Sequence, residues 1–139
     1  MSTRLKEKIE RIQQILKELV EDSAKQIPIV VEGRKDVNAL RYLGVEGPVL
    51  TVKTGGKSFA RALQEIEEIG ATEIILLLDF DRRGKQGIAY LKEELERKKI
   101  RVNLNFWRIF SALTRREIQC IESLTSYLET LEQKNGFRL

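Results

Sequence analysis

Histidine is absent from the 139-residue sequence, and cysteine occurs once, at position 120. Cys120 alone excludes an internal disulfide, and without histidine the chain can form neither a cysteine-histidine zinc cluster nor a histidine general base. Any catalysis must therefore use carboxylates, lysine, arginine or a bound metal. The sequence also lacks an apolar run near the ~20 residues that span a bilayer, and its charged start does not resemble a signal peptide. We expect a cytoplasmic protein without a membrane partner.

The composition is that of a single domain, with no room for a second enzyme domain. Hydrophobic residues make up 42% of the chain, which is enough apolar content to bury one continuous core. The 25 lysine and arginine residues exceed the 21 aspartate and glutamate residues, so the formal net charge is +4. A charge of this size is compatible with a polyanionic partner and does not require one.

The first 26 residues contain a regular apolar stripe. Leucine and isoleucine recur at alternating spacings of four and three, at positions 5, 9, 12, 16 and 19. This pattern predicts an amphipathic helix within residues 1–26. Three heptads are too few to indicate a coiled coil, so we expect the helix to pack on the domain that follows, with self-association into a homodimer as the alternative.

Residues 27–110 alternate between apolar runs and helical patterns. The predicted strands cover residues 28–32, 49–52, 73–78 and 100–107. The predicted helices between them cover residues 33–43, 58–69 and 85–99. The third strand is an unbroken run of isoleucine and leucine, as in a central strand covered on both faces. The fourth alternates with a period of two, as in a half-exposed strand near a sheet edge.

The last segment, residues 111–139, is predicted to hold one more helix and a loose tail. Thr114 and Glu117 have the spacing of a capping box, which predicts that the final helix begins there. We expect the tail beyond Lys134 to be loose. Alternating strands and helices with short connections predict an α/β layer fold, in which helices flank a parallel sheet of about four strands.

Three acidic residues follow two of the predicted strands. Glu32 closes the first strand, and Asp79 and Asp81 close the third. Ligands of α/β sheets bind beyond the carboxyl ends of the strands. Residues two apart in an extended chain point the same way, so both aspartates can face one crevice while Phe80 turns into the core. If the two strands are neighbours, all three carboxylates converge.

Converging carboxylates predict a cation site. Two carboxylates about 4 Å apart repel by roughly 4 kcal/mol at an effective dielectric of about 20, so a group of three needs protons or a cation. Mg²⁺ suits such a site because it favours a few carboxylates together with water and phosphate, and Mn²⁺ is the alternative. In another interpretation, Asp79 and Asp81 are turn residues that cap the next helix, and Glu32 is a helix acid near the positive dipole end.

Two motifs carry a family resemblance. Glu32-Gly33-Arg34-Lys35-Asp36 and Asp79-Phe80-Asp81-Arg82-Arg83-Gly84 resemble the signature of the Toprim family, which has Glu-Gly-x-x-Asp after its first strand and Asp-x-Asp, usually followed by Gly, after its third. The family includes type IA topoisomerases, gyrase-type enzymes, bacterial primases, overcoming-lysogenization-type nucleases and ribonucleases that mature small ribosomal RNA. The likeness covers residues 27–106 and implies a Toprim-like, Rossmann-like fold.

The resemblance also implies roles for single residues. Glu32 would be a general acid or base, or a metal ligand, while Asp79 and Asp81 would hold Mg²⁺. Asp36 would support the site, although an acid in a first helical turn is also favoured there by the helix dipole alone. Gly33 and Gly84 would give backbone room, with a plain turn role as the alternative.

The chain departs from the larger Toprim enzymes. It has no zinc-ribbon module of a primase and is too short for a topoisomerase gate. Tyr42, Tyr90 and Tyr127 lie within predicted helices and are interpreted as packing residues, so no strand-cleaving tyrosine is expected. It is most similar to small stand-alone Toprim proteins.

Several residues near the predicted site could contact phosphate. A true P-loop is disfavoured because Thr51 stands where the first glycine is required. The residues expected to contact phosphate are Lys53, Gly55, Gly56, Lys57, Arg82, Arg83 and Lys85. The alternative is an ordinary glycine turn for the first four and solvated loop charges for the last three. Trp107 could stack on a base, but the favoured interpretation packs it under a helix.

Two functions remain open at this point. The first is a metal-dependent nuclease that acts on structured RNA or on DNA, in which Glu32 moves a proton. The second is a binding module for RNA, a ribonucleoprotein or DNA, which bridges phosphate through a metal and works with a replication or repair partner.

Overall fold

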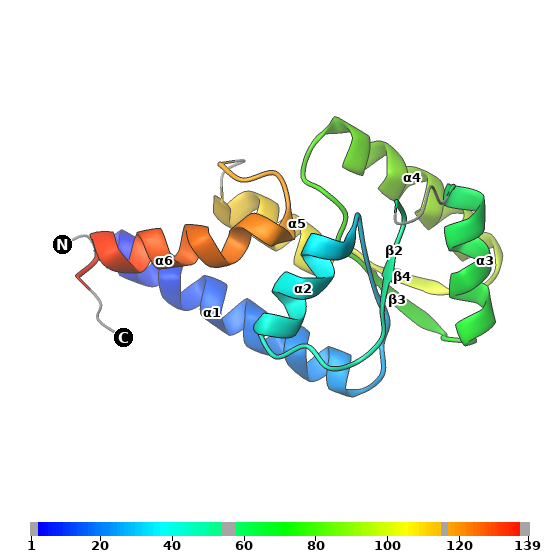
Figure 1. The fold of residues 1–139 in the computed structure, drawn as a ribbon, viewed down its shortest axis with the longest axis horizontal. Coiled ribbons are helices and arrows are strands. Elements are labelled where there is room, and N and C mark those ends of the chain that lie inside the picture. The colour runs from blue at the N-terminus through cyan, green and yellow to red at the C-terminus, as the bar shows by residue number, and fades with distance from the viewer. Residues whose placement is uncertain (1–2, 54–57, 115–116, 137–139) are drawn as a thin grey trace.

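The computed structural model describes residues 3–53, 58–114 and 117–136 (Figure 1). The helices are α1 (Thr3–Ala24), α2 (Arg34–Tyr42), α3 (Phe59–Ile69), α4 (Arg82–Arg97), α5 (Asn105–Thr114), the 3-10 helix η2 (Ile121–Ser123) and α6 (Leu124–Lys134). The strands are β1 (Ile29–Val31), β2 (Val49–Thr51), β3 (Glu73–Leu76) and β4 (Arg101–Asn103). Within the described ranges, no helix has the length and apolar character needed to cross a membrane.

The four strands form one parallel sheet in the order β2-β1-β3-β4, which confirms the predicted α/β fold. The chain moves from β1 outward to β2 on one side and then returns to place β3 on the other side. Such a reversal of strand order opens a crevice at the carboxyl ends of the two central strands. Ile29 of β1 lies opposite Ile75 of β3, so both strands end at the same edge of the sheet.

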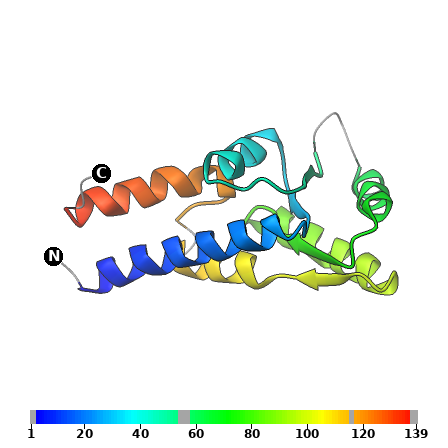
Figure 2. The ribbon, with the colours of Figure 1, turned by 90° about the horizontal axis from the view of Figure 1, so that it is seen from below.

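Helices cover both faces of the sheet (Figure 2). Alternate residues of the central strands enter two separate hydrophobic clusters. Val31 and Leu77 join the cluster built by α1, α2, α5 and α6. Val30 and Leu76 join the cluster built by α3 and α4. This two-sided burial explains why the sequence of the third strand is apolar without interruption.

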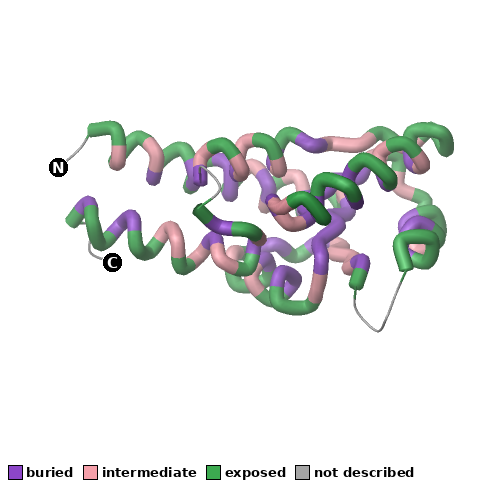
Figure 3. Tube along the Cα trace, turned by 90° about the horizontal axis from the view of Figure 1, so that it is seen from above, coloured by how far each residue is buried: buried purple, intermediate pink, exposed green. Residues whose placement is uncertain are grey.

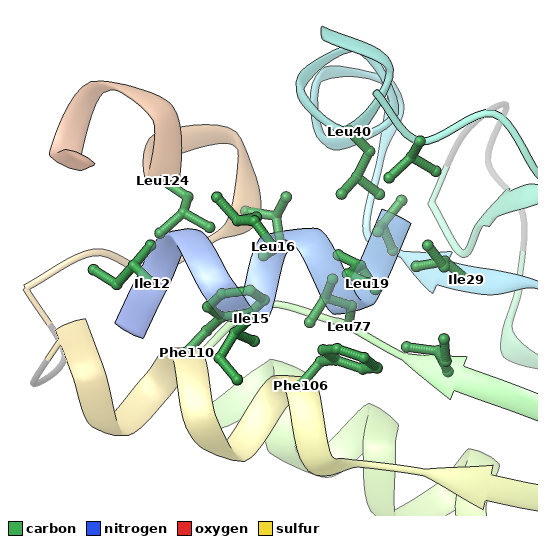
Figure 4. Packing of buried hydrophobic residues seen from close by; sticks show 14 of the residues in the cluster. Ile12, Ile15, Leu16, Leu19, Ile29, Leu40, Leu77, Phe106, Phe110 and Leu124 are labelled. Carbon is green, nitrogen blue, oxygen red and sulfur yellow. The ribbon is translucent and has the colours of Figure 1, made fainter. Parts of the chain in front are cut away.

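Helix α1 packs on the domain that follows it, which confirms the expected docking. Buried and exposed residues alternate along it (Figure 3). Its apolar stripe meets α5 and α6, with Ile15 close to Phe110 and Ile12 close to Leu124 (Figure 4). At its carboxyl end the hydroxyl of the buried Ser23 accepts a hydrogen bond from the Gly47 amide at 2.9 Å.

The predicted edge strand over residues 100–107 is wrong beyond Asn103. The strand β4 stops there, and α5 begins at Asn105. The side chain of Asn103 accepts a hydrogen bond from the Asn105 amide at 2.9 Å, which favours a turn into the helix. Phe106 and Phe110 are four residues apart and are both buried against α1, so burial on one helical face overrides the period-two pattern.

The predicted start of the final helix at Thr114 is also wrong. Thr114 is the last residue of α5, and its hydroxyl donates back to the Ser111 carbonyl oxygen at 3.3 Å instead of capping a new helix. The final helix α6 begins at Leu124, after η2. Positions 115–116 of the predicted capping box and most of the predicted tail fall outside the described ranges.

The tyrosine side chains differ in their surroundings. Tyr127 packs against the cluster around α1, and its hydroxyl donates to Glu117 Oε1 at 2.8 Å. Tyr42 is 76% exposed on α2, so its interpretation as a packing residue is wrong. Tyr90 is 41% exposed on α4 and contacts Phe59.

Candidate metal centre

The carboxylate of Glu32 is fixed where three strands end. Glu32 follows β1 and is buried. Its Oε2 accepts a hydrogen bond at 3.3 Å from the amide of Asp79, just beyond β3. Its Oε1 lies 3.0 Å from Nζ of Lys53, just beyond β2. The order of the sheet therefore brings the predicted residues Glu32, Lys53 and Asp79 together.

Asp36 joins this group from the first turn of α2. Its Oδ2 accepts from the Gly33 amide at 3.2 Å, and its Oδ1 accepts from the Glu122 amide at 3.0 Å. The side chain is buried, so the interpretation of Asp36 as a dipole-favoured surface acid is wrong. Burial raises the pKa of Asp36, while its two amide hydrogen bonds act in the opposite direction.

Asp79 lies in the middle of the acidic group. One carboxylate oxygen each of Asp36 and Asp79 and the Sγ of Cys120 lie within 4.8 Å of one another. Burial, together with the nearby charges of Glu32, Asp36 and Asp81, raises the pKa of Asp79 to about 7, against the lowering effect of Lys53. We call the carboxylates of Glu32, Asp36 and Asp79 the acidic centre.

Asp81 adopts the capping geometry that the sequence left as an alternative. It is the N-cap of α4, and its Oδ1 accepts from the Gly84 amide at 2.8 Å. Its charge still contributes to the raised pKa of Asp79. Helix α4 begins at Arg82, three residues earlier than predicted. Arg82, Arg83 and Lys85 are therefore exposed residues at the start of a helix.

A segment from the far end of the chain forms one wall of the centre. We call residues 117–123 the cover segment. The carbonyl oxygen of Gln119 accepts a hydrogen bond from the Phe80 amide at 2.6 Å, and the Glu122 amide binds Asp36. Cys120 lies between these two contacts. Sequence reasoning missed Gln119, Cys120 and Glu122, because no local pattern links them to strands so distant in sequence.

The donor set fits a hard divalent cation. The centre offers carboxylate oxygens, which are the ligands that Mg²⁺ and Mn²⁺ prefer. Burial raises the pKa of the Cys120 thiol, and the charges of Asp36 and Asp79 act in the same direction. In the metal-free protein these effects disfavour the thiolate form of Cys120.

The two predicted glycines differ in their surroundings. A Cβ atom on Gly84 would overlap the backbone carbonyl of Asp79, so the first turn of α4 packs directly on the acidic centre. A Cβ atom on Gly33 would meet no atom within 4 Å, and the extended φ of −153° suits any residue. Packing within the chain therefore requires glycine at position 84 and not at position 33.

Trp107 supports the loop that carries the aspartates. Its indole N–H donates to the carbonyl oxygens of Leu78 at 2.9 Å and Asp79 at 3.2 Å, and its ring lies 5.9 Å from that of Phe80. Phe80 is buried, as predicted. Trp107 is packed, as the favoured interpretation holds, but it lies within α5 rather than at the end of a strand under a helix. The predicted phosphate contacts at Gly55, Gly56 and Lys57 fall in positions that the structure does not describe.

Comparisons with known proteins identify the family of the chain. The family model of the Toprim domain matches residues 26–104. The UPF0292 protein of Methanosarcina acetivorans is 33% identical over 132 residues, which cover 94% of this chain and 89% of the relative. The UPF0292 protein of Methanocaldococcus jannaschii is 37% identical over 123 residues, which cover 88% of this chain and 93% of the relative.

A solved structure is also similar. A protein from Aquifex aeolicus superposes with a TM-score of 0.65 at 30% identity, over 79% of this chain and 94% of the other. The sequence motifs, the sheet order and the family match all lead to the same assignment. The chain belongs to the Toprim domain family.

Proposed function

We propose that the chain is a divalent-metal-dependent nuclease that cleaves phosphodiester bonds of RNA or DNA. Its membership in the Toprim family indicates a metal-dependent function that involves nucleic acid. The observation that carries the proposal is the pair of Asp36 and Asp79, which have carboxylate oxygens within 4.8 Å of each other. Glu32 lies beside this pair and accepts a hydrogen bond from the Asp79 amide. Such crowding is unfavourable unless a cation or a proton compensates it.

Asp79 and Asp36 would hold Mg²⁺ or Mn²⁺, with Asp81 beside them. The bound cation would neutralise negative charge that develops on the scissile phosphate. Lys53 lies at the same edge of the sheet and would attract the phosphate backbone, together with the exposed Arg82, Arg83 and Lys85.

Glu32 is suited to carry a proton. Lys53 and the Asp79 amide each hold one of its carboxylate oxygens, so the group is kept in one orientation. A positioned carboxylate can accept a proton from the attacking water and return it to the leaving oxygen. Glu32→Gln would keep the shape of the side chain and remove this capacity.

The second candidate function is a binding module without turnover. The contacts that two of the acids already make favour it: Asp81 caps α4, and Glu32 is paired with Lys53. Acids engaged in this way could serve a structure that only bridges phosphate through a metal. The module would then bind RNA, a ribonucleoprotein or DNA for a replication or repair partner.

Turnover distinguishes the two functions. Labelled RNA and DNA are incubated with the protein in Mg²⁺ or Mn²⁺, and the products are separated by size. A nuclease produces cleavage that disappears with EDTA, with Asp79→Ala and with Glu32→Gln, while Glu10→Gln on the exposed side of α1 serves as the matched control. Metal-dependent binding without products would establish the second function and contradict the first. Sequencing nucleic acid that co-purifies from native cells would identify the substrate.

A further inference from the structure

A hollow of about 470 Å³ lies beside the acidic centre, on the side of α3 and α4. Glu32 forms part of its wall, together with Lys53 beyond β2 and Arg83 in the first turn of α4. Phe59 at the start of α3 and Tyr90 on α4 also line it. We call these five residues the aromatic hollow. Its size falls within the ~300–1,000 Å³ of sites that hold small organic groups.

The two aromatic rings form a pair that is open to solvent. Their centroids are 5.8 Å apart, and their planes are inclined by 48°. Phe59 is 37% exposed and Tyr90 is 41% exposed, which places both among the few large exposed hydrophobic side chains in the described part of the chain. An exposed apolar pair next to a functional centre is typical of a binding surface.

Core packing does not account for the positions of these rings. Helix α3 buries Ala62, Leu63 and Ile66 in the cluster on its side of the sheet, and Phe59 lies at the helix start beyond them. Helix α4 buries Ile88 and Leu91 in the same cluster, while Tyr90 faces outward. The rings meet because α3 and α4 pack side by side (Figure 1).

A glycine lets the Phe59 ring lie against α4. A Cβ atom on Gly87 would come within 2.9 Å of Cζ of Phe59 and 3.0 Å of Cδ1 of Leu78. Any larger residue would push the ring away from the helix. The backbone of α4 at Gly87 therefore forms the surface against which the Phe59 ring lies.

Two cationic side chains line the same hollow as the rings and Glu32. The Lys53 ammonium is 3.0 Å from Glu32 Oε1, and Arg83 is exposed at the rim. Helix α3 also begins at this hollow, with Ser58 as its N-cap, so its positive dipole end faces the same space. Flat apolar rings flanked by cations match the two parts of a nucleotide, its base and its phosphate.

We propose that the aromatic hollow binds an unpaired base of the strand whose phosphate reaches the acidic centre. The base contacts Phe59 and Tyr90, and the adjoining phosphate contacts Lys53 and Arg83. A base inside a duplex is stacked on its neighbours and cannot enter, so the substrate is single-stranded nucleic acid or an unpaired loop. The inference rests on the proposed function and deepens it by naming the substrate class.

Binding of short strands tests this assignment. Labelled oligouridine and oligodeoxythymidine of about ten nucleotides, a length within the site sizes of single-strand binding proteins, are titrated with the Asp79→Asn protein, in which turnover is blocked. Phe59→Ala and Tyr90→Ala are each expected to weaken binding about 5- to 100-fold, as for the loss of one stacked base. Tyr90→Phe keeps the ring and should bind like the parent. A duplex of the same length should respond to none of these substitutions.

Tyr42→Ala is the matched control, because Tyr42 is an exposed tyrosine on α2 that does not line the hollow. Circular dichroism confirms that each variant is folded, and Tyr90→Leu tests the ring if an alanine variant does not fold. Equal single-strand affinity in the parent and in both ring variants would overturn the proposal. The proposal would also be overturned if the protein is a dimer and Phe59→Ala converts it into a monomer without loss of single-strand affinity. The rings would then join two copies of the chain.

The two proposals can fail separately. Ring-dependent strand binding by a wild-type protein that never cleaves would support the hollow and contradict the nuclease. Mg²⁺-dependent cleavage that is unchanged by Phe59→Ala and Tyr90→Ala would support the nuclease and contradict the hollow.

Discussion

The backbone amide of Asp79 donates a hydrogen bond to Oε2 of Glu32 over 3.3 Å, although 47 positions separate the two residues in the sequence. This contact exists because β1 and β3 are neighbours and end at the same edge of the sheet. Lys53 holds the other oxygen of Glu32 from the end of β2. The acidic centre is thus a product of strand order, and the free energy that assembles it comes from burial of the strands rather than from the acids themselves.

The stability of the metal-free protein should depend on the protonation of Asp79. Its pKa in the folded protein is raised from 3.8 to about 7, first by burial and then by the charge of Glu32. The folded state therefore binds this proton more tightly than the unfolded state does. The stabilising contribution of the proton is complete below pH 3.8 and is lost as the pH rises to about 7.

Asp79→Asn isolates this contribution. Without metal, we expect the variant to have a larger free energy of unfolding than the wild type at pH 8. We expect this gap between the variant and the wild type to be smaller at pH 5. Urea denaturation at both values measures the gap, and saturating Mg²⁺ should stabilise the wild type alone. A gap that is the same at both pH values would contradict the prediction.

Trp107 should report metal binding by its fluorescence. It is the only tryptophan in the sequence, and its indole N–H donates to the carbonyl oxygens of Leu78 and Asp79. A cation held at Asp79 changes the electric field at the indole ring. We expect a saturable change on titration with Mg²⁺, reversed by EDTA and absent in Asp79→Asn. Glu10→Gln should keep the response, and a signal that persists in Asp79→Asn would exclude binding at the acidic centre.

The two motif glycines should differ in their response to alanine: Gly84→Ala should destabilise the fold, and Gly33→Ala should have little effect. At position 84 the added methyl group overlaps the Asp79 carbonyl, so Gly84→Ala should lower the free energy of unfolding by about 1–3 kcal/mol. At position 33 the methyl group meets nothing within 4 Å, so Gly33→Ala should stay within about 0.5 kcal/mol of the wild type. Denaturation curves of the two variants, measured side by side, check the contrast. Similar losses in both would contradict the packing described for α4.

Asp36 should stabilise the cover segment. Asp36→Ala removes the acceptor for the amides of Gly33 and Glu122, and the loss should cost about 1–3 kcal/mol. Asp36→Asn keeps one acceptor oxygen and should cost less. Hydrogen exchange at the Glu122 amide provides a local readout, which should accelerate in Asp36→Ala. Unchanged protection of that amide would show that Asp36 does not hold the segment.

Local patterns predicted the elements whose burial is regular along the sequence. The spacing of leucine and isoleucine in residues 1–26 indicated a helix with one buried face, and α1 is that helix. The apolar run after Glu73 indicated a central strand, and β3 lies inside the sheet. The acids at Glu32 and Asp79 were placed at neighbouring strand ends because parallel strands end at one edge.

Other elements depend on contacts that no short window contains. The side chains of Leu104 and Phe106 fit a period of two, yet Phe106 and Phe110 also fit one helical face, and only the presence of α1 selects the helix. Cys120 was expected in a helix, and it reaches the acidic centre because the cover segment is extended there. No local pattern links Tyr90, interpreted from the sequence as a packing residue, to Phe59, since their pairing arises from the packing of α3 on α4.

The hydrogen bond between Asp36 and Glu122 joins residues that are 86 positions apart. During synthesis, a ribosome has therefore translated both motifs well before the residues that shield them emerge. A nascent chain that ends before Gln119 exposes the Phe80 amide and the Asp36 carboxylate to water. The centre is therefore complete only after the cover segment has been translated and has folded onto it.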